Sequence, residues 1–178
     1  MGINIDNTTA RLVDRLSEVG VVKVYCGSQF SAALTAKGRV YTWGKGDNFR
    51  LGHGQEDHVR FPRLVEELNG TVVDLAVGLM HVVAVTKEGK LYGWGKNDQS
   101  QLGYLNSSVP VPTLLSDTSA RYVGLVCGAG CTVAWTNLDQ WSVPLRAPFV
   151  IDVTEQTFRW LDNLLTEVFI VFVGNNGI

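Results

Sequence analysis

Apolar and polar residues alternate in short runs along most of the chain, which is the pattern of half-buried β-strands. The first copy of this pattern is rich in β-branched residues and is punctuated by glycine. Lys37-Gly38 has the composition of a two-residue hairpin turn. Pro62 falls near the start of the last run, where no ladder hydrogen bond needs its missing donor. The pattern predicts strands at Val21–Cys26, Ser31–Thr35, Arg39–Trp43 and, as an edge strand, Arg60–Val65.

The same pattern returns 51 residues later. Aligning 21–52 with 72–103 gives 13 identities in 32 positions. The stretches Tyr41–Gly44 and Tyr92–Gly95 occupy equivalent places, and a Leu-Gly pair follows each of them. Self-similarity at a fixed period of this length marks an array of repeated units. The second copy predicts strands at Val72–Val77, Val82–Thr86, Lys90–Trp94 and Pro112–Leu115.

A third copy begins at Tyr122 and ends after Thr136, without another Tyr-x-Trp-Gly. A capping box at Asp152 and an apolar stripe after it predict a helix in the segment that follows. The apolar run 168–173 is β-prone and resembles the raw edge of a cut chain or an alternative terminus. At the other end of the chain, apolar residues on one face and the stop at Gly20 predict a short lead-in helix over 8–19.

Four short strands per unit of about 50 residues, with glycines at the corners, are typical of a β-propeller blade. A solenoid fits less well because the repeat contains no helical pattern. We therefore expect an all-β fold: a partial β-propeller of about two and a third blades with flanking short helices. The expected organisation is a lead-in at 1–20, propeller repeats at 21–136 (copies 21–71, 72–121 and a partial 122–136) and an exit segment at 137–178.

At this point the residues resemble a known family, the repeat of the regulator of chromosome condensation. The resemblance covers about 21–136 and implies that the complete domain is a seven-bladed propeller. Because a propeller closes on itself, this chain alone does not complete one. We expect it to be a fragment joined to the remaining blades of a parent chain; the alternative is that its edges pair with other copies. The matching order is Gly27…Gly38-x-x-Tyr41-x-Trp43-Gly44…Leu51-Gly52…Pro62, repeated from Gly78 to Gly103.

The exit segment carries a narrower resemblance. Trp141–Pro144, then Pro148–Val153 and the expected helix, are similar to the exit from such a propeller in the giant HECT-type ubiquitin ligases. The resemblance implies a place in the ubiquitination pathway for the parent protein. Ubiquitin transfer itself requires a catalytic HECT cysteine, and none of the three cysteines of this chain stands in a HECT-like setting.

Charge and cysteine content narrow the classes of partner. The formal net charge is −2, so the chain lacks the basic stripe that nucleic-acid binding usually needs. No apolar run approaches the ~20 residues of a membrane-spanning helix. An odd number of cysteines and an N-terminus without a signal-peptide pattern predict a reducing compartment. We expect a cytoplasmic or nuclear location, with no direct nucleic-acid contact and no membrane span.

The tryptophans, cysteines and histidines of the repeats are better explained as packing or loop residues than as stacking, metal-binding or catalytic groups. Trp43 and Trp94 have a fixed spacing from the turn glycines, which favours core layers over platforms for stacking bases. Cys26 and Cys127 share one register position with Val77, which is typical of a small buried apolar site and not of a metal ligand. Cys131 shares its register with Phe30 and His81. His53, Asp57 and His58 lack the nucleophile elbow of a hydrolase. We expect no metal, no cofactor and no catalytic residue.

The loops after each Trp-Gly are the expected binding surface, because loops on a rigid scaffold carry function. An arginine with an aromatic residue is a common anchor pair at protein interfaces. The alternative is that these are plain solvated loops. The candidate partner-binding residues are Asp47, Asn48, Phe49, Arg50, His53, Asp57, His58, Arg60, Asp98 and Gln99.

Three functions compete at this level. The first is a non-catalytic protein–protein interaction module within a large ubiquitin ligase. The second, implied by the founding member of the family, is guanine-nucleotide exchange on a Ran-like small GTPase. That activity is associated with an inserted β-wedge, for which the 51-residue repeat leaves no room. The third is association with chromatin or a membrane, which the net charge of −2 disfavours.

Overall fold

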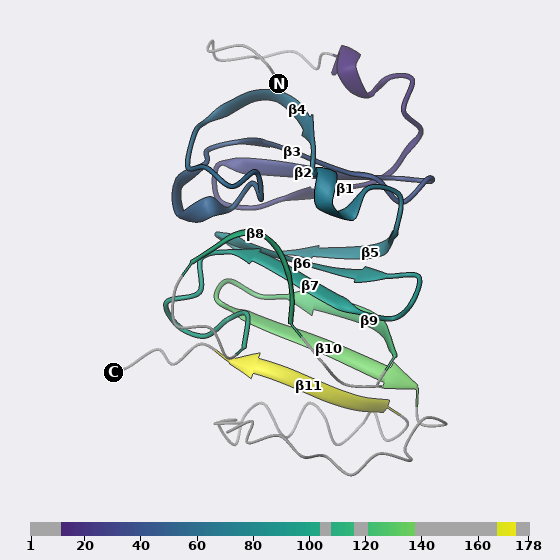
Figure 1. Ribbon diagram of the computed structural model, residues 1–178, viewed down its shortest axis with the longest axis vertical. Coiled ribbons are helices and arrows are strands. Elements are labelled where there is room, and N and C mark those ends of the chain that lie inside the picture. Colours follow the sequence, from purple (N-terminus) through teal and green to yellow (C-terminus); the bar gives the residue numbers. More distant parts are fainter. Residues whose placement is uncertain (1–11, 104–107, 116–120, 138–166, 174–178) are drawn as a thin grey trace.

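The computed structural model describes residues 12–103, 108–115, 121–137 and 167–173. Each copy of the repeat forms its own antiparallel sheet, and the sheets follow one another along the long axis of the molecule (Figure 1). The first two sheets have four strands in sequence order, as consecutive hairpins require. The third has three strands in the order β11-β10-β9. We call β1–β4 the first blade, β5–β8 the second blade and β9–β11 the third sheet.

The strands agree closely with the alternation in the sequence. The first blade contains β1 (Val21–Cys26), β2 (Phe30–Thr35), β3 (Val40–Gly44) and β4 (Val59–Leu64). The second blade contains β5 (Val72–Val77), β6 (His81–Thr86), β7 (Leu91–Gly95) and β8 (Val109–Leu114). The third sheet contains β9 (Tyr122–Cys127), β10 (Cys131–Asn137) and β11 (Glu167–Val173). Three 3-10 turns lie outside the strands: η1 (Asp14–Leu16), η2 (Asp47–Phe49) and η3 (Glu66–Leu68).

The hairpin turn predicted at Lys37-Gly38 joins β2 to β3. Gly38 has φ +74°, a left-handed conformation that side chains other than glycine rarely adopt. Its N–H donates to the carbonyl of Thr35 at 2.9 Å, which closes the turn. The glycine at this position therefore sets the register of Leu34 against Val40 across the hairpin.

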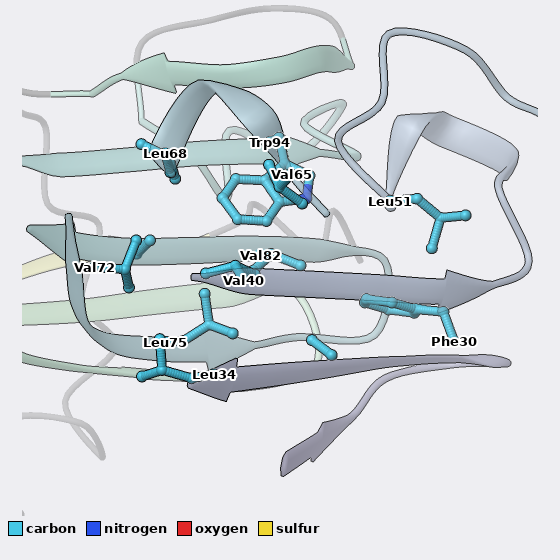
Figure 2. Close-up of a cluster of buried hydrophobic side chains, with 12 residues drawn as sticks. Phe30, Leu34, Val40, Leu51, Val65, Leu68, Val72, Leu75, Val82 and Trp94 are labelled. Carbon is cyan, nitrogen blue, oxygen red and sulfur yellow. The ribbon is translucent and has the colours of Figure 1, made fainter. Parts of the chain in front are cut away.

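The first and second blades bury an apolar core between their facing sheets. Phe30, Ala32 and Leu34 of β2 lie in the same cluster as Leu75 and Trp94 of the second blade (Figure 2). Side chains at alternate positions of β2 point to one face of its sheet, so these three share a face. A second cluster joins the second blade to the third sheet through Val83 and Val85 of β6 with other buried residues. The second blade is thus covered on both faces.

Trp94 shows why the Trp-Gly and Leu-Gly pairs recur at fixed spacing. Its side chain is fully buried, and the backbone of Gly52 lies against the indole. A Cβ atom at Gly52 would lie 2.7 Å from the indole nitrogen, closer than packed atoms allow. Gly52 also has φ +75°, so a side chain there would be strained as well. The Leu-Gly of one blade therefore covers the tryptophan of the next, and the predicted core role of Trp43 and Trp94 is confirmed by their burial.

The face of the first blade that points away from the second blade, which we call its outer face, is not packed against another sheet among the described residues. Val24 is 69 % exposed, whereas its counterpart Leu75, 51 residues later, is 2 % exposed. Cys26 is exposed as well. The expectation that Cys26 occupies a buried apolar site is therefore wrong for the first copy, because burial at this register comes from a neighbouring blade. Cys127 is half-buried, and burial raises the pKa of its thiol to about 12.

The lead-in is less helical than predicted. Within residues 12–20 the only helical element is the single 3-10 turn η1, and none of its residues is buried. Val13 precedes it and offers no side-chain hydrogen bond to cap it. A short helix without a cap or a buried face is marginal in water, which explains the difference.

The apolar run near the C-terminus is a strand in the structure. β11 pairs antiparallel with β10, with Cys131 opposite Val173 and Asn137 opposite Glu167. It occupies the place beside β10 that β3 and β7 hold beside β2 and β6. The third sheet thus takes its third strand from a segment about 30 residues downstream, instead of from the next hairpin. The helix expected after Asp152 lies outside the described residues.

Truncating Leu75 tests the packing between the blades. Leu75→Ala leaves a cavity between two sheets, and we expect it to lower the free energy of unfolding by about 2–4 kcal/mol. Val24→Ala removes an exposed side chain at the same register of the first blade, and we expect a change within about 0.5 kcal/mol. Urea denaturation followed by tryptophan fluorescence measures both. Equal losses in the two variants would contradict the packing described here.

Candidate functional site

Two loops follow the Trp-Gly pairs and begin in the same way. In the first loop (45–58) the N–H of Lys45 donates to the carbonyl of Gln29 at 2.8 Å. In the second loop (96–103 among the described residues) the N–H of Lys96 donates to the carbonyl of Met80, also at 2.8 Å. Each loop is therefore anchored to the turn between the first two strands of its own blade. The anchor gives both loops the same starting direction.

Arg50 holds the first loop together from inside. Its side chain is 2 % exposed, although the sequence predicted it as a partner contact. Its Nε donates to the carbonyl of Asp47 at 2.7 Å, and one terminal nitrogen donates to the carbonyl of Ser28 at 2.8 Å. The structure thus gives Arg50 a role inside the loop, and its role in partner binding stays a prediction. Burial lowers the pKa of its guanidinium, while the charge of Asp47 raises it.

Asp47 lies at the exposed end of this arrangement. Its carboxylate is 2.9 Å from the ammonium of Lys45, and the hydrogen bond from Lys45 is the largest cause of its lowered pKa. Asp98 is paired with Lys96 at 3.2 Å at the same register of the second loop. The two loops thus repeat one lysine–aspartate pair, each near the surface.

Further bonds fix the rest of the first loop. The N–H of Asn48 donates to a carboxylate oxygen of Glu56 at 2.6 Å. The N–H of Gly46 donates to Nδ1 of His58 at 3.2 Å. Asn48 has φ 58°, a left-handed conformation that asparagine tolerates better than most residues. These contacts tie both ends of the loop to each other, so that it presents a defined surface.

His53 is a neutral structural group. Thr42 Oγ1 donates to the carbonyl of Leu51 at 2.7 Å, which uses its only hydrogen. The Nε2 of His53, 2.9 Å away, must therefore be the donor to Thr42. Burial, and then the charge of Arg63, lowers the pKa of His53 to about 4. At neutral pH the ring is an uncharged hydrogen-bond donor.

The second loop uses amides where the first uses arginine. The Oδ1 of Asn97, a fully buried residue, accepts from the N–H of Leu102 at 2.7 Å. Gln101 occupies the register of Arg50, is also buried, and accepts from the N–H of Gln99 at 3.0 Å through its side-chain oxygen. Both loops therefore have a buried polar side chain at this register, which organises the backbone.

The predicted site residues divide by exposure. Asp57, His58, Arg60 and Asp98 are exposed, whereas Asp47, Asn48, Phe49, His53 and Gln99 are half-buried and Arg50 is buried. Their role in partner binding stays a prediction. No group of three or more potential metal ligands occurs among the described residues. Nor does the described part of the chain contain a helix long and apolar enough to cross a membrane.

The surface next to the first loop was not predicted from the sequence. A groove of about 530 Å³ lies along β4 and is lined by Arg15, Asp57, His58, Arg60, Phe61 and Arg63, among others. Only Asp57, His58 and Arg60 were among the predicted residues. A position-by-position comparison of β4 with β8 would have shown that the charges belong to the first blade alone.

His81 is the most deeply buried titratable group at the boundary between the second blade and the third sheet. It is fully buried, and its Nε2 lies 3.0 Å from Thr132 Oγ1, which itself donates to the carbonyl of Gln101 at 2.8 Å. Nε2 is therefore the donor, and Nδ1 has no partner in the described structure. Burial lowers the pKa of His81 from its ordinary value of 6.5 to about 4.

Comparison with known proteins agrees with this geometry. The family model of the regulator of chromosome condensation (RCC1) repeat matches residues 37–85 and 88–135. The E3 ubiquitin-protein ligase HERC2 of Mus musculus is 47 % identical over 163 residues, which is 90 % of this chain and 3 % of that protein. The chain therefore spans a small fraction of this relative. The resemblances drawn from the sequence, to the repeat and to a ubiquitin ligase, are confirmed by these matches.

Solved structures show the same fold. The crystal structure of human WBSCR16 is similar with a TM-score of 0.61 and 30 % identity, over 66 % of this chain and 31 % of that chain. Yeast RCC1 (Prp20), solved bound to Kap60, is similar with a TM-score of 0.60 and 24 % identity, over 66 % and 30 % of the two chains. The expected all-β, partial-propeller architecture is confirmed.

The buried state of His81 makes the structure sensitive to acid. Its pKa is lower in the folded chain, so the unfolded chain binds the proton more readily as pH falls from about 6.5 to about 4. The stability that the neutral ring provides is complete above pH 6.5 and is lost across this window. His81→Phe, which copies Phe30 at the same register, removes this dependence. We expect the wild type to lose about 2–3 kcal/mol more than the variant between pH 7 and 4.5, measured by urea denaturation.

Arg50 offers a test of the loop's internal bonding. Arg50→Met keeps the apolar stem but leaves the carbonyls of Asp47 and Ser28 without their donor, and we expect a loss of about 2 kcal/mol. Cleavage after Glu56 by a glutamate-specific protease should become faster as the loop opens. Arg39→Met, at an exposed position in the β2–β3 turn, is the control. Equal cleavage rates in the Arg50 variant and the wild type would contradict the role given to Arg50.

Proposed function

Because the chain belongs to the regulator of chromosome condensation repeat family, we propose that it is a non-catalytic protein–protein interaction module of a larger ubiquitin ligase. The single observation that carries the proposal is the pair of anchored loops after Trp43-Gly44 and Trp94-Gly95. Their backbones are held by internal hydrogen bonds, while Asp57, His58 and Asp98 are exposed. Rigid loops with exposed polar residues bind a partner at a low cost in conformational entropy.

The relatives support the wider setting. The 47 % identity to HERC2 over 90 % of this chain supports the proposed context of a ubiquitin ligase, where an interaction module would hold a substrate or a regulator. The exposed outer face of the first blade, marked by Val24, would be covered by a further blade of the parent protein. We propose a cytoplasmic or nuclear location for the module, as the cysteine content and the N-terminal sequence led us to expect.

Nucleotide exchange on a Ran-like GTPase was the alternative function considered from the sequence. No feature of the described residues favours nucleotide exchange over partner binding. HERC2, which is similar over 90 % of this chain, is named as a ubiquitin ligase. We therefore do not propose it. Addition of the chain to such a GTPase loaded with a fluorescent nucleotide should leave the release rate at its intrinsic value.

The proposal is tested by removing the lysine-paired aspartates from both loops. We expect Asp47→Ala with Asp98→Ala to reduce capture of at least one specific protein from cell extract by about fivefold or more, because each loop loses the carboxylate of its lysine–aspartate pair. The bait is the full 178-residue chain, and captured proteins are quantified by mass spectrometry. Glu66→Ala with Glu88→Ala removes two exposed acids outside the loops and is the charge-matched control. If both double variants capture the same set as the wild type, loop-mediated binding is wrong.

A further inference from the structure

The groove along β4 concentrates positive charge in a chain that is acidic overall. Its lining includes three arginines, Arg15, Arg60 and Arg63, against one acidic residue, Asp57. The formal net charge of the whole chain is −2. A local excess of cations of this kind in a concave site favours an anionic ligand and raises its rate of association.

The ring of Phe61 contacts two of these arginines. The residue is 44 % exposed, and the guanidinium carbons of Arg15 and Arg60 lie 5.0 and 5.6 Å from the ring centroid. Both distances are within the range of a cation–π interaction. A guanidinium held by a ring loses less freedom when it binds a carboxylate, and its planar N–H groups match the two carboxylate oxygens.

The second blade shows that the fold does not need these residues. β8 keeps the valine, proline and leucine of β4, with Val109, Pro112 and Leu114 in the places of Val59, Pro62 and Leu64. At the three other positions, Arg60, Phe61 and Arg63 are replaced by Pro110, Val111 and Thr113. The strand residues that pack against the scaffold are thus repeated in the second blade, whereas the residues that would bind a ligand are not. The charged groove is therefore an addition to the scaffold.

The position of β4 suits an extended ligand. β4 is the last strand of its sheet, and among the described residues no strand pairs with its outer edge. An extended peptide could add to this edge, but Pro62 removes one backbone donor. Side-chain contacts to the arginines would therefore supply most of the affinity and the specificity.

We propose that this groove binds an extended acidic peptide segment of a partner protein, whose carboxylates pair with Arg15, Arg60 and Arg63. The inference rests on the proposed interaction function and names the chemistry of the partner. Nucleic acid, the other common polyanion, fits less well, because it requires a longer basic surface to neutralise successive phosphates. A groove of about 530 Å³ holds only a few residues of an extended chain.

A defined probe tests the inference. The probe is a fluorescein-labelled peptide of about ten residues that alternates glutamate and serine, with glutamine replacing glutamate in the neutral control. Fluorescence anisotropy with the full chain should show binding of the glutamate peptide, no measurable binding of the glutamine peptide, and weaker binding as salt is added. Single-stranded oligothymidylate is the competing polyanion and should bind more weakly than the peptide.

The matched variant replaces two residues of β4 with their counterparts in β8. Phe61→Val with Arg63→Thr gives β4 the residues of β8 at two of the three positions that differ and keeps Arg60. We expect the affinity to fall about tenfold or more as charged hydrogen bonds are lost. Lys37→Thr removes one exposed charge that does not line the groove, and should change the affinity less than about twofold. Circular dichroism checks the fold, and Arg60→Gln replaces the double variant if that variant is unfolded.

The outcomes separate this inference from the proposed function. Equal binding of the two peptides, equal losses in the double variant and Lys37→Thr, or tighter binding of the oligonucleotide would each overturn the acidic-peptide assignment. Partner capture through Asp47 and Asp98 would then still stand, because neither residue lines the groove. Loss of peptide binding in the matched variant alone would support the groove even if loop-dependent capture failed.

Discussion

Each blade of this protein can bury its apolar faces only against a neighbouring blade, and the rest of the structure follows from that constraint. A four-stranded sheet has two faces, and the described residues contain no α-helix that could cover them. Leu75 and Trp94 are buried because the first blade lies against them, and Gly52 has no side chain because the indole needs its space. Trp-Gly and Leu-Gly recur at one period because each blade needs these residues for its contact with the next blade. Loops and outer strands are left free to vary.

That freedom explains how one scaffold carries two kinds of surface. The loops after the Trp-Gly pairs keep their starting bonds and a buried polar residue, Arg50 in one blade and Gln101 in the next. Their exposed residues differ. On the outer strand the packing residues Pro62 and Leu64 are kept, while the positions between and beside them carry charge in the first blade only. The residues proposed to bind partners therefore lie at positions where packing does not restrict the residue type.

Much of the fold was predictable from the sequence, because alternation of apolar residues and glycine at the turns are local signals. Strands such as Val21–Cys26 and the turn at Gly38 depend on residues close in the chain. Cys26 was placed wrongly because burial at its register depends on a neighbouring blade. The burial of Arg50 was not predicted, because it involves the distant carbonyl of Ser28. The groove was not predicted because it joins Arg15 to β4 across more than 40 residues, and because its charged residues occur in only one of the two copies.

Hydrogen exchange of β1 and β5 measures the central claim most directly. Both are first strands of four-stranded sheets and both begin with two valines, but only β5 is packed against a sheet on each face. The account predicts that amides of β5 exchange about tenfold or more slowly than those at equivalent positions of β1, because opening β5 also disrupts contacts between blades. Equal exchange in the two strands, or faster exchange in β5, would show that the blades do not stabilise each other through their facing sheets.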